Sequence, residues 1–518
     1  MGKVALVGAG PGDIGLITVK GLKYIKIADC IIYDRLIGDD ILMLSKPGCE
    51  LIYVGKENHH HTLCQDEINE LLEQKARKYV FVVRLKGGDP YVFGRGGEEA
   101  LYLRERGIEF EVVPGISSAV AVPAYAGIPV THRGIAKGFH VVTSHSKKDD
   151  MMDIDFSLYK DEKETAIFLM GLSHVEEIAQ KLINAGRSED TKAAVISNGT
   201  KNNQKKCVGT LKNIGKLVRE SKIVSPAIIV VGEVVGLESE LSFFENRPLY
   251  GKRYVVPYIL SGEFSFSEGW KRKKENELIG GLEDLGATVL AVKTGEIMPV
   301  LTQSNEEDAV PFEILNDLCE KDYIIFTSKN AVNAFMWNLY MNGYSIHSIG
   351  KAKIAVVGEK TAEELKRFGI ISEKLPAVAT GKALAENLLP QIKASTKVLW
   401  FSGKETGNSV EDVLSDKCRL IKFVCYENMD EDICLDDENI EFISDCDGIL
   451  FTSASNVRRF CKASKNVLPQ TVFAIGPVCR KTLENMDVEG ILEPEKSTYE
   501  DLIKLCVDEA EIIEEEGK

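Results

Sequence analysis

Short aliphatic runs alternate with amphipathic stretches along the first third of the chain. The runs are rich in β-branched residues and predict strands at 4–7, 30–33, 51–54 and 80–84. An acidic pair at 66–67 opens a stretch whose apolar residues fall at helical spacing, namely Ile68, Leu71, Leu72 and Ala76. This alternation predicts an α/β sheet with helices packed against it.

A second series of apolar runs follows at 166–170, 193–197 and 227–231, and it predicts another lobe that extends to about residue 240. The stretch 243–250 is expected to be a junction, because a new strand is predicted directly after it at 253–256. Residues 112–131 carry no charge over a membrane-spanning length, but Pro114, Pro123 and Pro129 interrupt them. We expect a buried loop and a short helix there.

The C-terminal half contains an internal repeat. Residues 322–335 match 447–460 in length and pattern, with a shared Phe-Thr-Ser, and 355–358 match 473–476. Each repeat ends in a helix-like run. Two similar α/β lobes are therefore predicted, facing a cleft of the kind in which ligands bind.

Charge and cysteine usage narrow the function. The 518 residues carry a formal net charge of −16, which disfavours nucleic acid and anionic membranes as partners. The 12 cysteines include no CxxC pair, and Asp13 comes too early for a signal peptide, so we expect reduced thiols and a cytoplasmic location. The acidic tail at 508–516 is expected to be a solvated helix end.

Glycine-rich turns follow successive predicted strands. The first, at 7–13, is not a dinucleotide fingerprint, because GxGxxG needs glycine where Asp13 stands and Pro11 lacks an amide hydrogen. Further turns lie at 84–99, 113–118 and 127–133, together with the pairs 33–34 and 55–56. Such turns gather at the carboxyl ends of strands, where open α/β sheets bind ligands.

The motifs VGAGPGD, YD, VGK, RLKGGDPYVFGRGGEE, VPGISS and GIPVTHR closely resemble those of the tetrapyrrole methylase family over residues 1–245, with lobes of about 1–115 and 116–245. The resemblance implies S-adenosylmethionine as methyl donor and methylation of uroporphyrinogen III at C2 and C7, which gives precorrin-2. It implies Asp34 as proton acceptor and Lys56 as proton donor. The implied cofactor contacts are Pro11, Gly87, Gly88, Asp89, Val92, Ser117, Ser118, Met170 and Gly199.

The chemistry agrees with these residue types. Methyl transfer from a sulfonium depends mainly on positioning, and a carboxylate accepts the proton that the methylated ring loses. The substrate has eight carboxylates while the chain is acidic, so cations must be concentrated locally. The candidates are Arg84, Lys86, Arg95, His132 and Arg133. Taken singly, each of these residues also fits a structural role in a cap or a surface ion pair.

This half departs from its family in two places. Glu57 follows Lys56 where the family commonly has Arg, and Ser117-Ser118 replaces a usual Thr-Ala. The run His59-His60-His61 invites a metal site, but consecutive side chains diverge and no partner has ligand spacing, so no metal is predicted.

In the C-terminal half, the hydroxyls and amides of the two Phe-Thr-Ser turns suit carboxylates, and simple helix capping is the alternative. The residues concerned are Thr327, Ser328, Thr452 and Ser453. With 357–362, 424–426 and 475–477, the half 250–518 resembles the uroporphyrinogen-III synthase family over about 250–510. The resemblance implies closure of hydroxymethylbilane with inversion of ring D, Tyr426 near the leaving hydroxyl and Thr361 nearby.

The C-terminal half also departs from its family. Val256-Pro257 stands where Thr-Arg is usual, Val478-Cys479 stands where Thr is usual, and Pro257 predicts an edge or an irregular strand end. The whole chain is therefore predicted to be a bifunctional enzyme of sirohaem or cobalamin synthesis, with a homodimer implied by the methylase resemblance. An active methyltransferase with a non-catalytic tetrapyrrole-binding module is the alternative. An RNA methylase is disfavoured by the charge.

Overall fold

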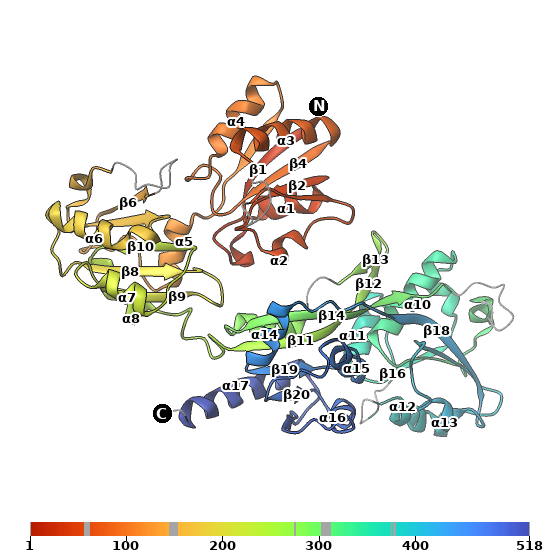
Figure 1. Cartoon of the computed structure of the whole chain (residues 1–518). Coiled ribbons are helices and arrows are strands. Elements are labelled where there is room, and N and C mark those ends of the chain that lie inside the picture. Colours follow the sequence, from red (N-terminus) through yellow and green to blue (C-terminus); the bar gives the residue numbers. More distant parts are fainter. Residues whose placement is uncertain are drawn as a thin grey trace. The chain divides into compact units, whose positions relative to one another are not determined.

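The computed structural model describes residues 2–55, 63–144, 154–273, 276–301, 312–373, 376 and 380–516. Its contacts divide the chain into two compact units, one formed mainly by residues 1–252 and the other mainly by 253–512 (Figure 1). Within the described ranges, no helix is long and apolar enough to cross a membrane.

The first lobe of the N-terminal unit is a parallel five-stranded sheet in the order β3-β2-β4-β1-β5. Its strands are β1 Lys3–Gly8, β2 Cys30–Tyr33, β3 Glu50–Tyr53, β4 Phe81–Lys86 and β5 Phe110–Val113, which confirms the four predicted runs within a residue or two. Helices α1 Val19–Ile27, α2 Asp39–Leu42, α3 Gln65–Lys78 and α4 Gly96–Glu105 complete the lobe. As predicted, α3 buries Ile68, Leu72 and Ala76.

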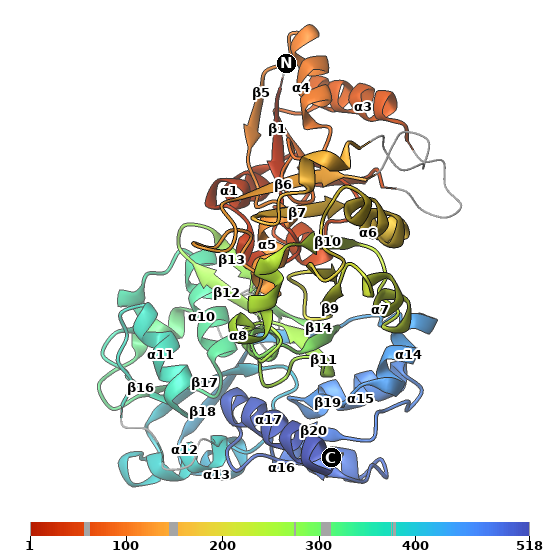
Figure 2. The ribbon, with the colours of Figure 1, turned by 90° about the vertical axis from the view of Figure 1, so that its left-hand side faces the viewer.

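The second lobe holds a mixed sheet in the order β6-β7-β10-β8-β9. Its strands are β6 Gly138–Thr143, β7 Glu164–Leu169, β8 Lys192–Ser197, β9 Lys205–Thr210 and β10 Ala227–Val231, three of which fall on the predicted runs. Helices α5 Ser118–Tyr125, α6 Val175–Asn184, α7 Ile214–Glu220 and α8 Glu238–Leu241 are labelled in Figure 2. The uncharged window is strand, loop and the eight-residue helix α5, as expected.

The two similar lobes of the C-terminal unit are joined by one nine-stranded sheet, ordered β16-β15-β17-β18-β14-β11-β19-β20-β21. The strands are β11 Arg253–Leu260, β14 Thr288–Pro299, β15 Tyr323–Phe326, β16 Lys353–Val356, β17 Lys397–Gly403, β18 Arg419–Asp430, β19 Gly448–Phe451, β20 Val472–Ala474 and β21 Ile491–Leu492, with a hairpin of β12 Gly262–Ser265 and β13 Gly269–Arg272. The two twelve-residue strands β14 and β18 pair antiparallel at the centre. Separate hydrophobic cores form around β15 and β19.

The repeat seen in the sequence forms two matching strand-to-helix units. Strand β15 leads into α10 Lys329–Met341, and β19 leads into α15 Ala454–Ala463. The residues before these helices have nearly the same backbone, with φ −161° and ψ 157° at Ser328 and φ −160° and ψ 154° at Ser453. The other helices of this unit are α9 Glu277–Asp284, α11 Glu359–Arg367, α12 Gly381–Leu388, α13 Glu411–Leu414, α14 Asp437–Asp445, α16 Pro477–Glu484 and α17 Tyr499–Glu516.

The edge position predicted for the strand around Pro257 is wrong, because β11 lies between β14 and β19. The alternative, a strand end, is also wrong, because Pro257 is the fifth of the eight residues of β11. The ladder to β19 covers Tyr254 and Val255, so Pro257 lies beyond it and its missing N–H interrupts no bond of that ladder. Its carbonyl oxygen accepts a hydrogen bond from Asn456 Nδ2 at 3.0 Å.

Candidate active sites

Three glycine turns of the N-terminal unit meet at the carboxyl ends of β1, β4 and β5. Gly10 and Gly88 form an isolated bridge, with Gly88 N donating to Gly10 O at 2.7 Å. A Cβ on Gly115 would lie 2.1 Å from Gly88 O, and one on Gly8 would lie 2.5 Å from Gly115 N. Only glycine permits this approach of three backbones, so the loops form a cradle of main-chain groups.

Asp89 closes the cradle. Its Oδ1 accepts from Tyr91 N at 2.8 Å and its Oδ2 accepts from Gly115 N at 3.0 Å, so the carboxylate ties the second turn to the third. Gly87 packs against Leu36, where a Cβ would lie 2.8 Å from the Leu36 Cβ. Ser117 caps α5 by accepting from Ala119 N at 3.3 Å, Ser118 is the first residue of that helix, and Val92 lies partly exposed.

The second lobe contributes the turn 198–200. Asp13, two residues after Pro11, donates its amide to Thr200 Oγ1 at 3.1 Å, and Tyr125 Oη donates to Asp13 Oδ2 at 2.7 Å. A Cβ on Gly199 would lie 2.3 Å from a Val122 methyl carbon. The structural roles of Asp13 and Tyr125 were not predictable from the sequence, since both depend on contacts more than 100 residues apart in the chain. Met170 follows β7 with φ +55° and is half exposed.

Asp34 lies beside a buried charge cluster at the same edge of the sheet. Arg84 Nη2 lies 3.5 Å from Asp34 Oδ2, and Arg84 Nε lies 3.2 Å from Glu99 Oε1. Lys86 Nζ contacts the same Glu99 oxygen at 2.8 Å. Arg84 and Lys86 are each 4% exposed and Glu99 is fully buried. Burial, with the neighbouring Arg84 charge, lowers the pKa of Lys86, and Glu99 opposes that shift.

This cluster changes the interpretation of two predicted cations. Because Arg84 and Lys86 are buried and share the Glu99 carboxylate, they are built into the wall beside Asp34 rather than presented to solvent. Sequence reasoning missed Glu99. The available signal was helical spacing, because Glu99 shares a face of α4 with the buried Leu103. Lys56, Glu57 and the histidines at 59–61 lie outside the described residues.

The remaining predicted cations are exposed. Arg95 pairs with Glu98 at 2.6 Å, whereas His132 and Arg133 lie in a tight turn closed by two hydrogen bonds between His132 and Ala136. That turn lines an open hollow of about 510 Å³, to which Lys137 and Lys163 also contribute. The hollow therefore has a basic lining that suits carboxylates. Among the described residues, no group of three or more His, Cys, Asp or Glu is placed to hold a metal ion.

In the C-terminal unit, Tyr426 lies on β18 and its phenol bonds to Ser328. The two oxygens are 3.1 Å apart. The ring covers Gly403, where a Cβ would lie 2.7 Å from the ring carbons. Burial raises the pKa of the Tyr426 phenol, so it remains a neutral hydrogen-bond donor. Strands β16, β15, β17 and β18 are parallel neighbours, so residues after each strand meet at one edge of this half-sheet.

The two Thr-Ser turns have the capping geometry that the sequence left as an alternative. Ser328 Oγ accepts from Ala331 N at 3.1 Å and Ser453 Oγ accepts from Asn456 N at 3.2 Å. Thr327 Oγ1 accepts from Trp400 Nε1 at 3.3 Å, and Thr452 Oγ1 accepts from Asn456 Nδ2 at 3.2 Å. Thr361 is buried in the first turn of α11. The serine hydroxyls therefore complete helices, while further amides of each first turn can serve a ligand.

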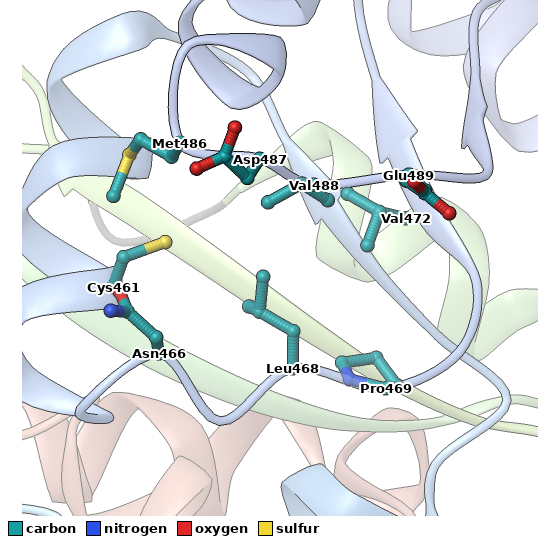
Figure 3. Close-up of a pocket in the computed structure, with 9 residues that line it drawn as sticks. All are labelled: Cys461, Asn466, Leu468, Pro469, Val472, Met486, Asp487, Val488 and Glu489. Atoms are coloured by element: carbon teal, nitrogen blue, oxygen red, sulfur yellow. The ribbon is translucent and has the colours of Figure 1, made fainter.

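Two other features lie in the lobe that contains β19 and β20. Cys479, where the family usually has threonine, is 3% exposed, and burial raises the pKa of its thiol to about 12. A cavity of about 360 Å³ is lined by Val472, at the amino end of β20, and by loop residues that include Leu468 and Val488 (Figure 3). The cavity is thus at the opposite end of the strand from the turns. All 12 cysteines are free.

Comparison with known proteins agrees with both halves. The family of tetrapyrrole (corrin/porphyrin) methylases matches residues 3–215, and the uroporphyrinogen-III synthase HemD family matches residues 276–504. A porphyrin biosynthesis protein HemD of Ruminiclostridium josui is 36% identical over 97% of this chain and 97% of its own. A uroporphyrinogen-III C-methyltransferase of Methanocaldococcus jannaschii is 50% identical over 46% of this chain and 98% of its own.

Among solved structures, a uroporphyrin-III C-methyl transferase of Thermus thermophilus complexed with S-adenosyl homocysteine aligns at 38% identity, over 45% of this chain and 93% of its own, with a TM-score of 0.39. The two families define a bifunctional enzyme of tetrapyrrole biosynthesis. The chain belongs to the porphyrin biosynthesis proteins that join a tetrapyrrole methylase to a uroporphyrinogen-III synthase.

Proposed function

We propose that the C-terminal half cyclises hydroxymethylbilane to uroporphyrinogen III and that the N-terminal half methylates this product at C2 and C7 to precorrin-2. The domains are 1–245 for the methyltransferase and 250–518 for the synthase. The observation that carries the proposal is the presence, in one chain, of a glycine cradle beside Asp34 and of a buried phenol at a Thr-Ser turn.

The N-terminal cradle fits S-adenosylmethionine, because its main-chain groups are exposed where the three backbones approach: Gly8 and Gly115 leave no room for a Cβ, and Gly88 has a φ of +66°. The proposed contacts add Pro11, Asp89, Val92 and the hydroxyls of 117–118, with Met170 and Gly199 from the second lobe. Bound there, S-adenosylmethionine supplies an electrophilic methyl group to a pyrrole carbon. The loops hold donor and acceptor in line, which is the main requirement of such a displacement.

Asp34 then accepts the proton that the methylated ring loses, and Lys56 is the proposed proton donor. Arg84, 3.5 Å from Asp34, holds the carboxylate at the carboxyl edge of the sheet. His132 and Arg133, with the basic hollow around them, bind side-chain carboxylates of the substrate. Arg95 is exposed and contributes in the same way.

In the C-terminal half, the neutral Tyr426 phenol transfers its proton to the hydroxyl of hydroxymethylbilane as the carbon–oxygen bond breaks, so that water leaves. The phenolate regains a proton from the ring carbon at which the macrocycle closes. The cationic intermediate is stabilised by its own side-chain carboxylates. These carboxylates bind amides in the first turns after Thr327-Ser328 and Thr452-Ser453. Thr361 adds a further hydroxyl from the neighbouring helix α11.

A coupled assay tests the proposal. Full-length protein receives hydroxymethylbilane and labelled S-adenosylmethionine, and the products are identified by mass and by isomer after oxidation. We expect a dimethylated type III product. Methylation that occurs only with ready-made uroporphyrinogen III would contradict the synthase reaction and favour a tetrapyrrole-binding module instead.

We further propose that the product enters sirohaem or cobalamin synthesis and that the enzyme is a cytoplasmic homodimer through its methylase domain. The chemistry of precorrin-2, an early dimethylated intermediate, suits either pathway. Sedimentation of the purified chain measures the oligomeric state, and a monomer at micromolar concentration would contradict the dimer.

A further inference from the structure

Lysine residues gather at the carboxyl edge of the C-terminal unit. Lys329 is the first residue of α10 and Lys360 is the second residue of α11. Strands β15 and β16, which precede these helices, are parallel neighbours, so both helices begin at the same edge. Lys273, which follows the hairpin strand β13, is close enough to act on the charge of Lys329.

This placement costs free energy in the unliganded protein. The positive end of a helix dipole disfavours cations, yet α10 has no acidic residue in its first turn. Lys329 is half-buried, and burial with the charges of Lys273 and Lys360 lowers the pKa of its amine. Like charges are thus concentrated at one place in a chain of net charge −16.

Two of the nearby carboxylates are already engaged, whereas Glu500 of α17 is near enough to Lys360 that its pKa is lowered by its own backbone amide and by the Lys360 charge. Glu277 bonds to Lys273 at 2.8 Å, and Glu364 bonds to Arg367 at 2.6 Å. Within the described part of the chain, no ion pair of 4.0 Å or less joins Lys329 or Lys360 to a carboxylate. These two amines therefore have unused capacity for an anion.

The lysines at this edge, Lys329 and Lys360, also lie close to the second Thr-Ser turn. Tyr499, the first residue of α17, lies with its ring centroid 5.4 Å from Lys360 Nζ, and its phenol is near enough to the Thr452 side chain for that side chain to act on its pKa. Lys329 directly follows Ser328, whose hydroxyl is 3.1 Å from the Tyr426 phenol. The lysines thus lie between the catalytic phenol proposed above and the turn of the other repeat.

We propose that Lys329 and Lys360, with the Tyr499 hydroxyl, form a binding site for side-chain carboxylates of the linear tetrapyrrole. The proposal deepens the synthase function proposed above and rests on it for the identity of the ligand. A polycarboxylate neutralises the gathered charge, and two ammonium groups on adjacent helices match two carboxylates of one substrate. Lys273, paired with Glu277, has a supporting role.

Kinetics of the full-length protein give the first test. In Lys329→Gln and Lys360→Gln, we expect the KM for hydroxymethylbilane to rise about tenfold, the factor that corresponds to about 1.4 kcal/mol, with kcat within about twofold. Arginine at either position should restore most of the affinity because it keeps the charge. Methylation of supplied uroporphyrinogen III should not change.

The matched control is Lys382→Gln, an exposed lysine of α12. An unchanged KM in both cluster variants would overturn the proposal.

A second measurement works without turnover. The chain is acetylated with a lysine-reactive ester in the presence and absence of uroporphyrin III, a stable octacarboxylate, and labelling is read peptide by peptide by mass spectrometry. We expect protection of Lys329 and Lys360 but not of Lys382. Equal labelling of all three at saturating uroporphyrin III would refute the site. If the wild-type protein fails to cyclise hydroxymethylbilane while protection persists, the synthase function fails and the carboxylate site stands.

Discussion

Asp34 shows how one side chain acquires a role from its surroundings. Its Oδ1 accepts from Leu36 N at 3.2 Å and its Oδ2 faces Arg84, so the carboxylate is held rather than mobile. We expect Asp34→Asn to lower the rate of methylation about 100-fold, because the amide cannot accept the proton. The affinity for S-adenosylmethionine, measured by calorimetry, should stay within about threefold.

The exposed Asp190 offers a matched control for this substitution. Asp190→Asn should leave both the rate and the affinity unchanged. Normal turnover in Asp34→Asn would remove Asp34 from the proton-acceptor role.

Tyr426 is the corresponding residue of the C-terminal half. Tyr426→Phe keeps the packing over Gly403 and removes the donor, so cyclisation should slow about 100-fold without stopping. Tyr340→Phe, at an exposed position of α10, is the control and should behave as wild type. The measurement is the rate of type III product formation, and an unaltered rate in Tyr426→Phe would exclude the phenol from the mechanism.

The phenol also predicts a pH profile. A tyrosine acts as donor below its pKa, and burial raises the pKa of Tyr426 above the ordinary value of 10.0. The donor form is therefore retained from about pH 7 to about pH 9. We expect no decline of the cyclisation kcat from phenol ionisation over that range. A decline in the wild type that is absent from Tyr426→Phe would show that the phenol ionises early.

At the scale of elements, helix α4 carries two adjacent glutamates with different roles. Glu99 is fully buried against Arg84 and Lys86, whereas Glu98 is exposed and pairs with Arg95. Glu99→Gln leaves two buried cations without their shared carboxylate and should lower the free energy of unfolding by about 3–5 kcal/mol. Glu98→Gln should change it by less than about 0.5 kcal/mol. Urea unfolding of both variants measures the difference, and equal effects would contradict the buried cluster.

The glycine turns permit a second matched pair. Gly115→Ala drives a methyl group into the Gly88 carbonyl and should cost about 1–3 kcal/mol, with loss of S-adenosylmethionine affinity. Gly97, inside α4, has no neighbour within 4 Å of the place that an added methyl group would take, so Gly97→Ala should stabilise the protein by about 0.5–1 kcal/mol. Thermal unfolding and calorimetry measure both quantities. A tolerated Gly115→Ala would show that the three loops are not closely packed.

For the whole molecule, the two active sites should be separable by mutation. Asp34→Asn supplied with hydroxymethylbilane should accumulate uroporphyrinogen III, because the synthase half is intact. Tyr426→Phe should methylate supplied uroporphyrinogen III at the wild-type rate. Chromatography of the oxidised products distinguishes these outcomes, and loss of both activities in either variant would mean that the halves depend on one another.

Much of the fold was readable from local patterns. Short β-rich apolar runs predicted the strands β1 to β4, and helical spacing predicted helix α3. Local patterns were enough because strands covered on both faces are apolar throughout, and a helix that packs on one face is apolar at helical spacing. The repeat predicted β15 with α10 and β19 with α15 for the same reason. The edge position of Pro257 was predicted wrongly, since strand order depends on pairing between residues nearly 200 positions apart.

The predictions about the active sites also divide into those that local sequence supports and those that need the tertiary structure. The resemblance to both enzyme families was visible in the sequence, in the glycine-rich motifs of the N-terminal half and in the two Phe-Thr-Ser turns of the C-terminal half. Backbone turns that approach a ligand demand particular residues at particular positions. Tertiary structure alone decided which charges are available. It buried Arg84 and Lys86 on Glu99, used Ser328 and Ser453 as caps, and brought Lys329 to the same edge as Lys360, which lies beside Tyr499. Coulomb energies and desolvation depend on distance and depth in three dimensions, which spacing along a chain does not encode.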